Sequence, residues 1–207
     1  MMPIDPVALA LTLVVATVFL AAVVVLIWWI DRYDREPWPL LLSVFLWGMV
    51  VAPGLVLGAG GLIGGITTWI GSGLLTSVVV APLVEELAKG VGILLVVVFS
   101  QHFDNPTDGL VYGTAVGLGF AVTENLLYGI WPGSMMVPGE AVSFVFGRTL
   151  FAAGVHALAS SMVGAGLGLG RTSGRRIWAV GWALLGLVVA VALHGGWNLA
   201  LLTVPFK

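Results

Sequence analysis

The chain has 207 residues, of which 59% are hydrophobic and 9% are charged, with a formal net charge of -2. So few charged residues cannot cover the surface of a soluble domain of this size, and the composition therefore indicates an integral membrane protein. No basic patch remains for nucleic acid, and the absence of cysteine excludes disulfides, thiol nucleophiles and cysteine metal sites.

Six segments are long and apolar enough to span a bilayer, which takes about 20 residues of helix. They lie near residues 7–30, 39–59, 74–100, 109–131, 143–169 and 177–204. We therefore expect an all-α fold, a polytopic transmembrane helical bundle that forms a single domain over 1–207. The first segment has no Lys or Arg before it, which favours a retained span over a signal peptide.

The breaks between these segments predict the topology. The charges and prolines of 31–39 cannot continue a buried helix. The Gly-rich stretch near 60–73 carries no charge, and we expect an interfacial or re-entrant piece there. In the third break, Asp108 is expected to be the N-cap of the following helix. The loop arginines fall in the first and last breaks, so the positive-inside rule places these in the cytoplasm and both termini outside.

The third span carries three ionisable side chains, Glu85, Glu86 and Lys89. Each costs about 2.5 to 3.5 kcal/mol at the centre of a membrane helix. Lys89 can pair with either carboxylate, at i,i+4 or i,i+3, and one negative charge is then left over. A buried ion pair that only fixes helix packing would explain this motif by itself.

Further polar residues in the later spans argue against a packing role alone. They are Glu124, Asn125, Arg148, His156, His194 and Asn198. Counted at 1.5 Å per residue from the outer end of each span, the glutamates and histidines lie about 10 to 20 Å deep. Four antiparallel helices therefore present carboxylates and imidazoles in one layer, from the outer half of the membrane to near its middle. The excess negative charge of this layer requires a protonated carboxyl group or a bound cation.

Glutamate and histidine around a water molecule are the groups that hydrolyse peptide bonds, either with a divalent metal or as a metal-free pair. Asn198 or an imidazole N–H can donate to the developing oxyanion. Neither HExxH nor GxSxG is present, so the sequence shows neither the usual metalloprotease motif nor the serine hydrolase motif. The main alternative is a proton- or cation-coupled transporter, and the lack of an internal repeat counts against it. A catalytically silent scaffold is the third interpretation.

At these residues the sequence resembles the PrsW family of intramembrane proteases, relatives of the CAAX prenyl endopeptidases and the abortive-infection membrane proteins. The match covers nearly the whole chain, including the loop at 31–39. Glu85, Glu86 and Lys89 look like the first motif of the family, and residues 120–125, FAVTEN, are similar to the second. His156 after Arg148, and His194 with Asn198, resemble the later motifs.

This resemblance implies an intramembrane endopeptidase that cleaves membrane-anchored protein substrates near the outer face of the cell membrane. The regulatory cleavage of anti-sigma factors is the known theme of the family. The partners expected are such a substrate and the lipid bilayer.

In the metal-dependent mechanism that we favour, Glu124, His156 and His194 bind a divalent metal, zinc in this interpretation, and Glu85 or Glu86 is the base. Lys89 and Asn198 complete the catalytic set, and the supporting residues are Asn125 and Arg148. A metal-free glutamate mechanism stays open, and spacing does not decide which glutamate is the base.

Overall fold

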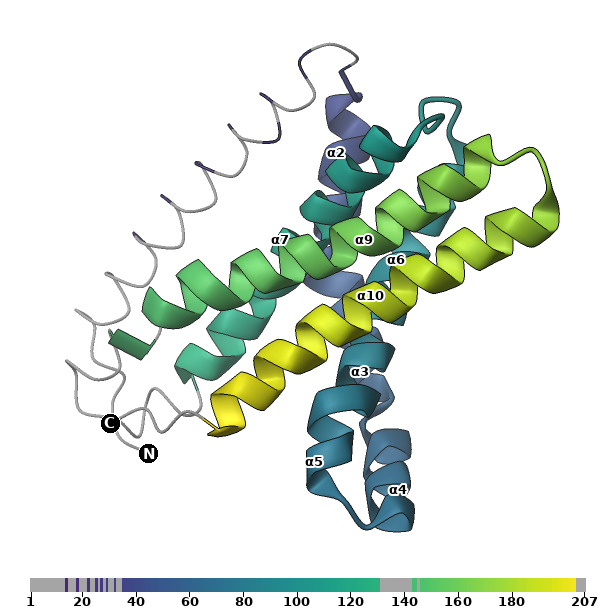
Figure 1. Cartoon of the computed structure of the whole chain (residues 1–207). Helices are drawn as coiled ribbons and strands as arrows, with labels where there is room; N and C mark the ends of the chain where they lie inside the picture. Colours follow the sequence, from purple (N-terminus) through teal and green to yellow (C-terminus); the bar gives the residue numbers. More distant parts are fainter. Residues whose placement is uncertain are drawn as a thin grey trace.

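The structure, a computed structural model, describes residues 35–130 and 146–203, together with positions 14, 18, 22, 25, 27, 29, 32, 143 and 144. Its elements in the continuous ranges are all helices (Figure 1). The predicted first span at 7–30 lies almost entirely outside the described residues, and so does the predicted loop within 131–142. The elements that are described confirm the expected all-α membrane bundle.

Four helical stretches among the described residues are long and apolar enough to cross a membrane: Trp38–Gly58, Pro106–Tyr128, Arg148–Thr172 and Arg176–Thr203. The first consists of α2 (Trp38–Leu46), the π-helix η1 (Trp47–Val51) and α3 (Ala52–Gly58). The others are α7 (Pro106–Ile130), the π-helix η4 (Arg148–Ala152) with α9 (Ala153–Thr172), and α10 (Arg176–Thr203). Each stretch matches a predicted span.

The predicted span at 74–100 is a helical run of three segments. These are α5 (Gly73–Leu75), the π-helix η2 (Thr76–Val80) and α6 (Ala81–Phe99). Glu85, Glu86 and Lys89 place three charged residues within five positions of α6, and this run is not among the four candidate spans. Pro53 in α3 and Pro82 in α6 each lie two residues after the end of a π-helix. A proline inside a helix lacks an N–H donor, and the wider π-turn accommodates that missing bond.

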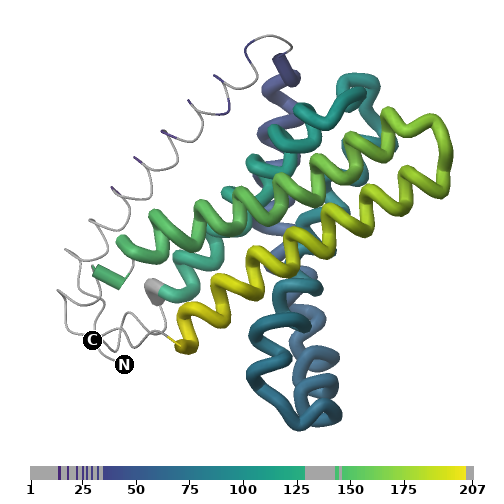
Figure 2. The backbone as a smooth tube through the Cα atoms, viewed as in Figure 1, coloured from purple at the N-terminus to yellow at the C-terminus, as the bar shows by residue number. Residues whose placement is uncertain are grey.

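The charge-free stretch near 60–73 forms the end of a helical hairpin that extends away from the bundle (Figure 2). Its first arm is α4 (Gly60–Ile70), a short apolar helix. Gly71 turns the chain with φ at 67°, a conformation that favours glycine. Ser72 then caps α5 by accepting a hydrogen bond from the Leu75 amide. A hydrogen bond of 2.9 Å between the Thr67 and Thr76 hydroxyls joins the two arms.

α7 is the central helix of the bundle. Of its candidate span, 61% is buried, compared with 17% of the span in α10. α9 lies between α7 and α10, and these three helices run side by side (Figure 1). α2, η1 and α6 pack against α7 as well. Side chains on α7 therefore have neighbours on several sides, and those on α9 pack between α7 and α10.

Glycines let α7 and α9 approach to backbone contact. A Cβ atom added at Gly117 would lie 2.3 Å from the carbonyl oxygen of His156, and one at Gly113 would lie 2.4 Å from that of Ser160. Such distances are far below van der Waals contact, so only glycine fits at these two positions. The small-residue spacing of α7 is therefore a packing seam, as its pattern predicts, and it determines where α9 presents His156 and Ser160.

The start of α7 differs in one detail from the expectation. Asn105 is the N-cap, because its side-chain oxygen accepts hydrogen bonds from the amides of Thr107 and Asp108. Asp108 accepts in return from the Asn105 amide at 3.0 Å, which completes a reciprocal capping arrangement. The prediction of Asp108 as the N-cap was wrong by three residues, although its capping role is confirmed.

Candidate active site

Polar side chains from α6, α7, η4, α9 and α10 meet inside the bundle. They are Glu85, Glu86, Lys89, Glu124, Arg148, His156 and His194. Hydrogen bonds and ion pairs join them into one network. All of the predicted site residues except Asn125 and Asn198 belong to this network.

Glu86 is the fully buried anchor of the network, with 0% of its surface exposed. Its Oε1 accepts hydrogen bonds from Lys89 Nζ at 2.5 Å and from His194 Nδ1 at 2.9 Å. Its Oε2 accepts a third hydrogen bond, from Ser160 Oγ at 2.8 Å. Because all three hydrogen bonds are buried, the Glu86 carboxylate fixes the positions of Lys89, Ser160 and His194.

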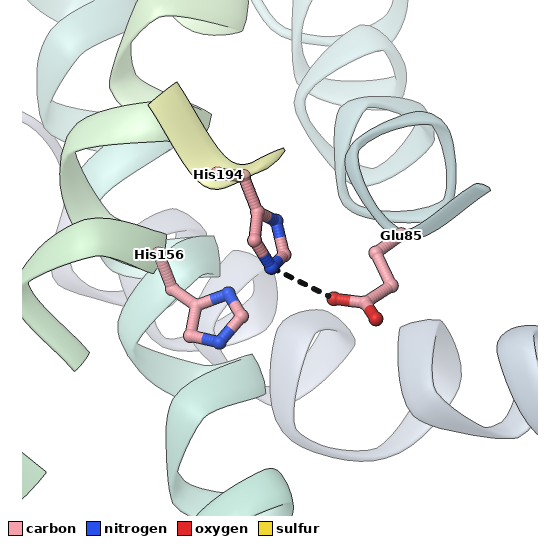
Figure 3. A group of neighbouring side chains, drawn as sticks. All are labelled: Glu85, His156 and His194. Carbon is pink, nitrogen blue, oxygen red and sulfur yellow. Dashed lines mark ion pairs between the residues drawn. The ribbon is translucent and has the colours of Figure 1, made fainter. Parts of the chain in front are cut away.

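His194 directs its second nitrogen at Glu85. Because Nδ1 donates its hydrogen to Glu86, the neutral ring keeps a lone pair at Nε2. Nε2 lies 3.6 Å from Glu85 Oε2 (Figure 3). That oxygen is buried and has no hydrogen-bond partner among the described residues. A buried polar atom without a partner calls for an explanation, and this pair is the point of the network at which a further group can bind.

His156 is engaged at both ring nitrogens. Lys89 Nζ lies 3.1 Å from Nδ1, and Glu124 Oε2 lies 2.7 Å from Nε2. Since the ammonium group can only donate, Nδ1 accepts and Nε2 carries the hydrogen. The rings of His156 and His194 meet edge to face with their centroids 4.6 Å apart. The two imidazoles, from α9 and α10, therefore belong to the same site.

Charge pairing leaves Glu85 as the unbalanced carboxylate. Glu86 pairs with Lys89, and Glu124 pairs with Arg148 at 2.8 Å. The Arg148 guanidinium also lies over the ring of Tyr128, 3.6 Å from its centroid. With both histidines neutral, no cation of the described network is left to balance Glu85, so this carboxyl group must carry a proton or bind a cation. This imbalance is the excess charge that the composition of the layer predicts.

Asn198 and Asn125 lie outside the network of ion pairs. Asn198 Nδ2 donates to the carbonyl oxygen of Ser77 at 2.9 Å, in the π-helix η2. π-helical turns leave backbone carbonyls in need of donors, and Thr123 supplies one in the same way to Met49 in η1. Asn125 is buried beside Glu124, and its Oδ1 has no partner in the described part of the chain.

Comparison with known proteins identifies the family. The profile of the PrsW family intramembrane metalloproteases matches residues 36–206. The chain is 34% identical to protease PrsW of Bacillus subtilis over 178 residues, which cover 83% of this chain and 73% of that protein. It is 30% identical to protease PrsW of Geobacillus kaustophilus, over 83% of this chain and 71% of that protein.

The chain belongs to the PrsW family of intramembrane metalloproteases. It is therefore a hydrolase that acts on peptide bonds, which agrees with the function predicted from its motifs. No solved structure matches the chain significantly.

A PrsW metalloprotease requires metal ligands, and the described residues offer one set of three. Glu85, His156 and His194 each present a ligand atom, and these atoms lie within 4.8 Å of one another. The donor set fits a metal because Glu85 Oε2 has no hydrogen-bond partner in the described part of the chain and His194 Nε2 keeps its lone pair. His156 fits through Nδ1, from which Lys89 must withdraw.

The carboxylates behind the two histidines support this fit. Glu86 accepts from Nδ1 of His194, and Glu124 lies against Nε2 of His156. Metal-binding imidazoles are commonly oriented by a carboxylate on the nitrogen that faces away from the metal. Glu124 was expected to be a ligand itself. It lies outside the set of three, because its Oε2 contacts Arg148 and His156.

The sequence motifs did not single out Ser160 or Tyr128, and they included Phe120 only as the first residue of FAVTEN. Ser160 follows His156 by four residues and therefore shares its helix face. Tyr128 follows Glu124 by the same interval. Phe120 packs on His156, and Lys89 Nζ lies 4.3 Å from the centroid of its ring. The i+4 spacing places Ser160 and Tyr128 on the same helix faces as His156 and Glu124. Spacing alone does not show that these side chains turn toward the site.

Proposed function

We propose that this chain cleaves membrane-anchored protein substrates in the outer half of the cell membrane, at a centre formed by Glu85 and His194. The observation that carries the proposal is the buried Glu85 Oε2. It has no hydrogen-bond partner among the residues that the structure describes, and it lies 3.6 Å from Nε2 of His194. The excess negative charge at this point favours a bound cation. Regulatory cleavage of an anti-sigma factor is the substrate role that we propose from the family resemblance.

Glu85, His156 and His194 are the residues that we assign to a divalent metal, with zinc as the metal that suits oxygen and imidazole donors. When bound, the metal supplies a Lewis acid that polarises the water and the scissile carbonyl. Glu86 holds His194 in the tautomer whose Nε2 faces Glu85. This assignment exchanges Glu85 and Glu124 relative to the roles expected from sequence.

Glu124 is the carboxylate that we assign as the proton acceptor. It is the most exposed of the three glutamates, with 21% of its side chain accessible, and Arg148 balances its charge. Water adds to the carbonyl carbon while its proton moves to a Glu124 oxygen. Glu124 then returns this proton to the amide nitrogen as the peptide bond breaks. Asn198 Nδ2 keeps a second hydrogen beyond the one given to Ser77, and we assign it to the developing oxyanion.

The test compares Glu85→Gln with Glu124→Gln in detergent-purified protein, by metal content and by cleavage of a reconstituted membrane-anchored substrate. Both variants should lose cleavage. Glu85→Gln should also lose the metal, whereas Glu124→Gln should retain about one equivalent. Metal loss in Glu124→Gln with retention in Glu85→Gln would reverse the two roles.

A metal-free mechanism is the second candidate, because both nitrogens of His156 already have partners. In that mechanism Glu85 and His194 activate the water by themselves. Full cleavage by wild-type protein that contains no metal after chelation would establish it in place of the metal-dependent one. Absence of cleavage in metal-loaded wild type, with every substrate tried, would count against the proposed function itself.

A further inference from the structure

The hydroxyl of Ser160 donates its hydrogen bond to a different helix, which is unusual for a buried serine on a membrane helix. Such a hydroxyl commonly donates to a carbonyl three or four residues earlier in its own helix. Ser161 does so, with Oγ 2.7 Å from the Leu158 oxygen. Ser160 is 0% exposed and donates instead to Glu86 on α6, a residue 74 positions away.

The bond from Ser160 determines the orientation of the Glu86 carboxylate. Lys89 and His194 both contact Oε1, whereas Ser160 is the donor to Oε2 among the described residues. Together with the two bonds to Oε1, this bond to Oε2 restrains rotation of the carboxylate about its terminal bond. Oε1 therefore stays directed at His194 Nδ1, which keeps the lone pair at Nε2 on the side of Glu85.

The backbone of Ser160 is itself fixed. Gly113 on α7 approaches it so closely that a Cβ there would lie 2.4 Å from the Ser160 oxygen. This close approach fixes the backbone of Ser160, and with it the position of its Cβ atom relative to Glu86. The chain of contacts runs from the glycine seam through Ser160 and Glu86 to His194.

We propose that Ser160 is a positioning residue that acts through Glu86 to set the tautomer of His194. This inference deepens the proposed function, since it concerns the same site, but the tautomer itself can be observed without cleavage or metal. Ser160 touches neither Glu85 nor a reacting atom. Its contribution is to keep one His194 nitrogen free.

The experiment compares Ser160→Ala with Ser161→Ala. The two serines are adjacent and buried, yet only Ser160 bonds to the network. The chain has three histidines, so selective ¹⁵N-histidine labelling gives few imidazole signals by NMR in detergent. A His194→Gln variant identifies the signals of His194.

Wild type and Ser161→Ala should show His194 protonated at Nδ1, and Ser160→Ala should show a mixture of the two tautomers. In steady-state cleavage, kcat of Ser160→Ala should fall about 10- to 100-fold, the range typical of residues that orient a ligand. KM should stay within about twofold of wild type, because the substrate contacts are unchanged. Ser160→Cys, a weaker donor of similar size, should be intermediate and replaces Ser160→Ala if the latter does not fold.

An unchanged His194 tautomer in folded Ser160→Ala or Ser160→Cys would overturn the inference, and so would an equal kcat loss in Ser161→Ala. A tautomer change in Ser160→Ala, together with wild type that cleaves no substrate, would instead leave the positioning role intact and remove the proposed function. The two failures are therefore distinguishable.

Discussion

Adjacent glutamates in α6 have different environments. Neighbouring residues on a helix point about 100° apart, so Glu86 faces the buried contact with α9 and α10 whereas Glu85 retains 13% exposure of its side chain. Glu86 has three hydrogen-bond partners and Glu85 Oε2 has none in the described structure. Glu86 is therefore a structural anchor, whereas Glu85 can bind a further group.

Replacement of the two glutamates should therefore have different effects on stability. Glu86→Ala removes the partner of the fully buried Lys89 and should lower the free energy of unfolding by about 3 to 5 kcal/mol. Glu85→Ala should leave it within about 1 kcal/mol of wild type, because the described residues make no hydrogen bond to Glu85 Oε2. Thermal or denaturant unfolding in detergent measures both variants. Equal destabilisation would show that Glu86 is not the anchor.

Asn198 offers a second test at the level of single residues. If its free N–H stabilises the oxyanion, Asn198→Ala should lower kcat about 10²- to 10³-fold with little change in KM. Thr203→Ala on the same helix is the matched control, because among the described residues its hydroxyl donates to carbonyl oxygens of α10. A variant of Asn198 that loses thermal stability but keeps kcat would restrict its role to capping the Ser77 carbonyl.

At the level of elements, close contact between α7 and α9 places the histidine opposite Glu124. The contact depends on Gly117 and Gly113, whose neighbours across the interface are backbone atoms of His156 and Ser160. Backbone atoms cannot change rotamer to make room for a methyl group. Any added side chain must therefore move a whole helix.

Gly117→Ala should accordingly separate α7 from α9 and displace His156. Overpacking of this kind costs about 1 to 3 kcal/mol, and cleavage should fall with it. Gly154→Ala in α9 is the control, since nothing lies within 4 Å of its added Cβ. The control should be neutral or stabilising by up to about 1 kcal/mol, the helix propensity gain over glycine. The measurements are the unfolding midpoints and the cleavage rates of the two variants. Equal values for Gly117→Ala and Gly154→Ala would show that Gly117 is not required for the contact between α7 and α9.

At the level of the whole molecule, the hairpin end and the loop between α9 and α10 should lie on opposite sides of the membrane. The described residues between Glu36 and Glu85 carry no charge, whereas Arg171, Arg175 and Arg176 flank the α9–α10 connection. The positive-inside rule puts that connection in the cytoplasm. With this orientation we expect the hairpin end and both termini to lie outside.

The natural chain has no cysteine, so single cysteines report on this topology directly. Ser72→Cys at the hairpin turn should react with a membrane-impermeant maleimide added to intact cells. Thr172→Cys at the end of α9 should react only after the membrane is opened. The reverse pattern would invert the orientation and place the catalytic layer in the inner half of the bilayer.

The sequence alone determined the helical class, the positions of the described spans and most members of the polar layer. Hydropathy, charge and motif spacing are local properties of the chain. A charged residue within an apolar run therefore indicates a polar site without knowledge of its neighbours in the fold. The capping role of Asp108 and the glycine seam were predictable for the same reason. The stretch near 60–73 was expected to be an interfacial or re-entrant piece, and the helix at 60–70 was not predicted as such because glycine has a low helix propensity.

Only the tertiary structure decided which glutamate is the anchor and which is free. Glu86 meets Ser160 and His194 across 74 and 108 positions of sequence, and spacing within one helix carries no information on such contacts. The exchange of Glu85 for Glu124 in the candidate ligand set depends likewise on Arg148, which reaches Glu124 from another helix. The glycines of α7 set how closely the helices pack and how they are rotated. This packing decides which glutamate pairs with which histidine, a choice that the sequence leaves open.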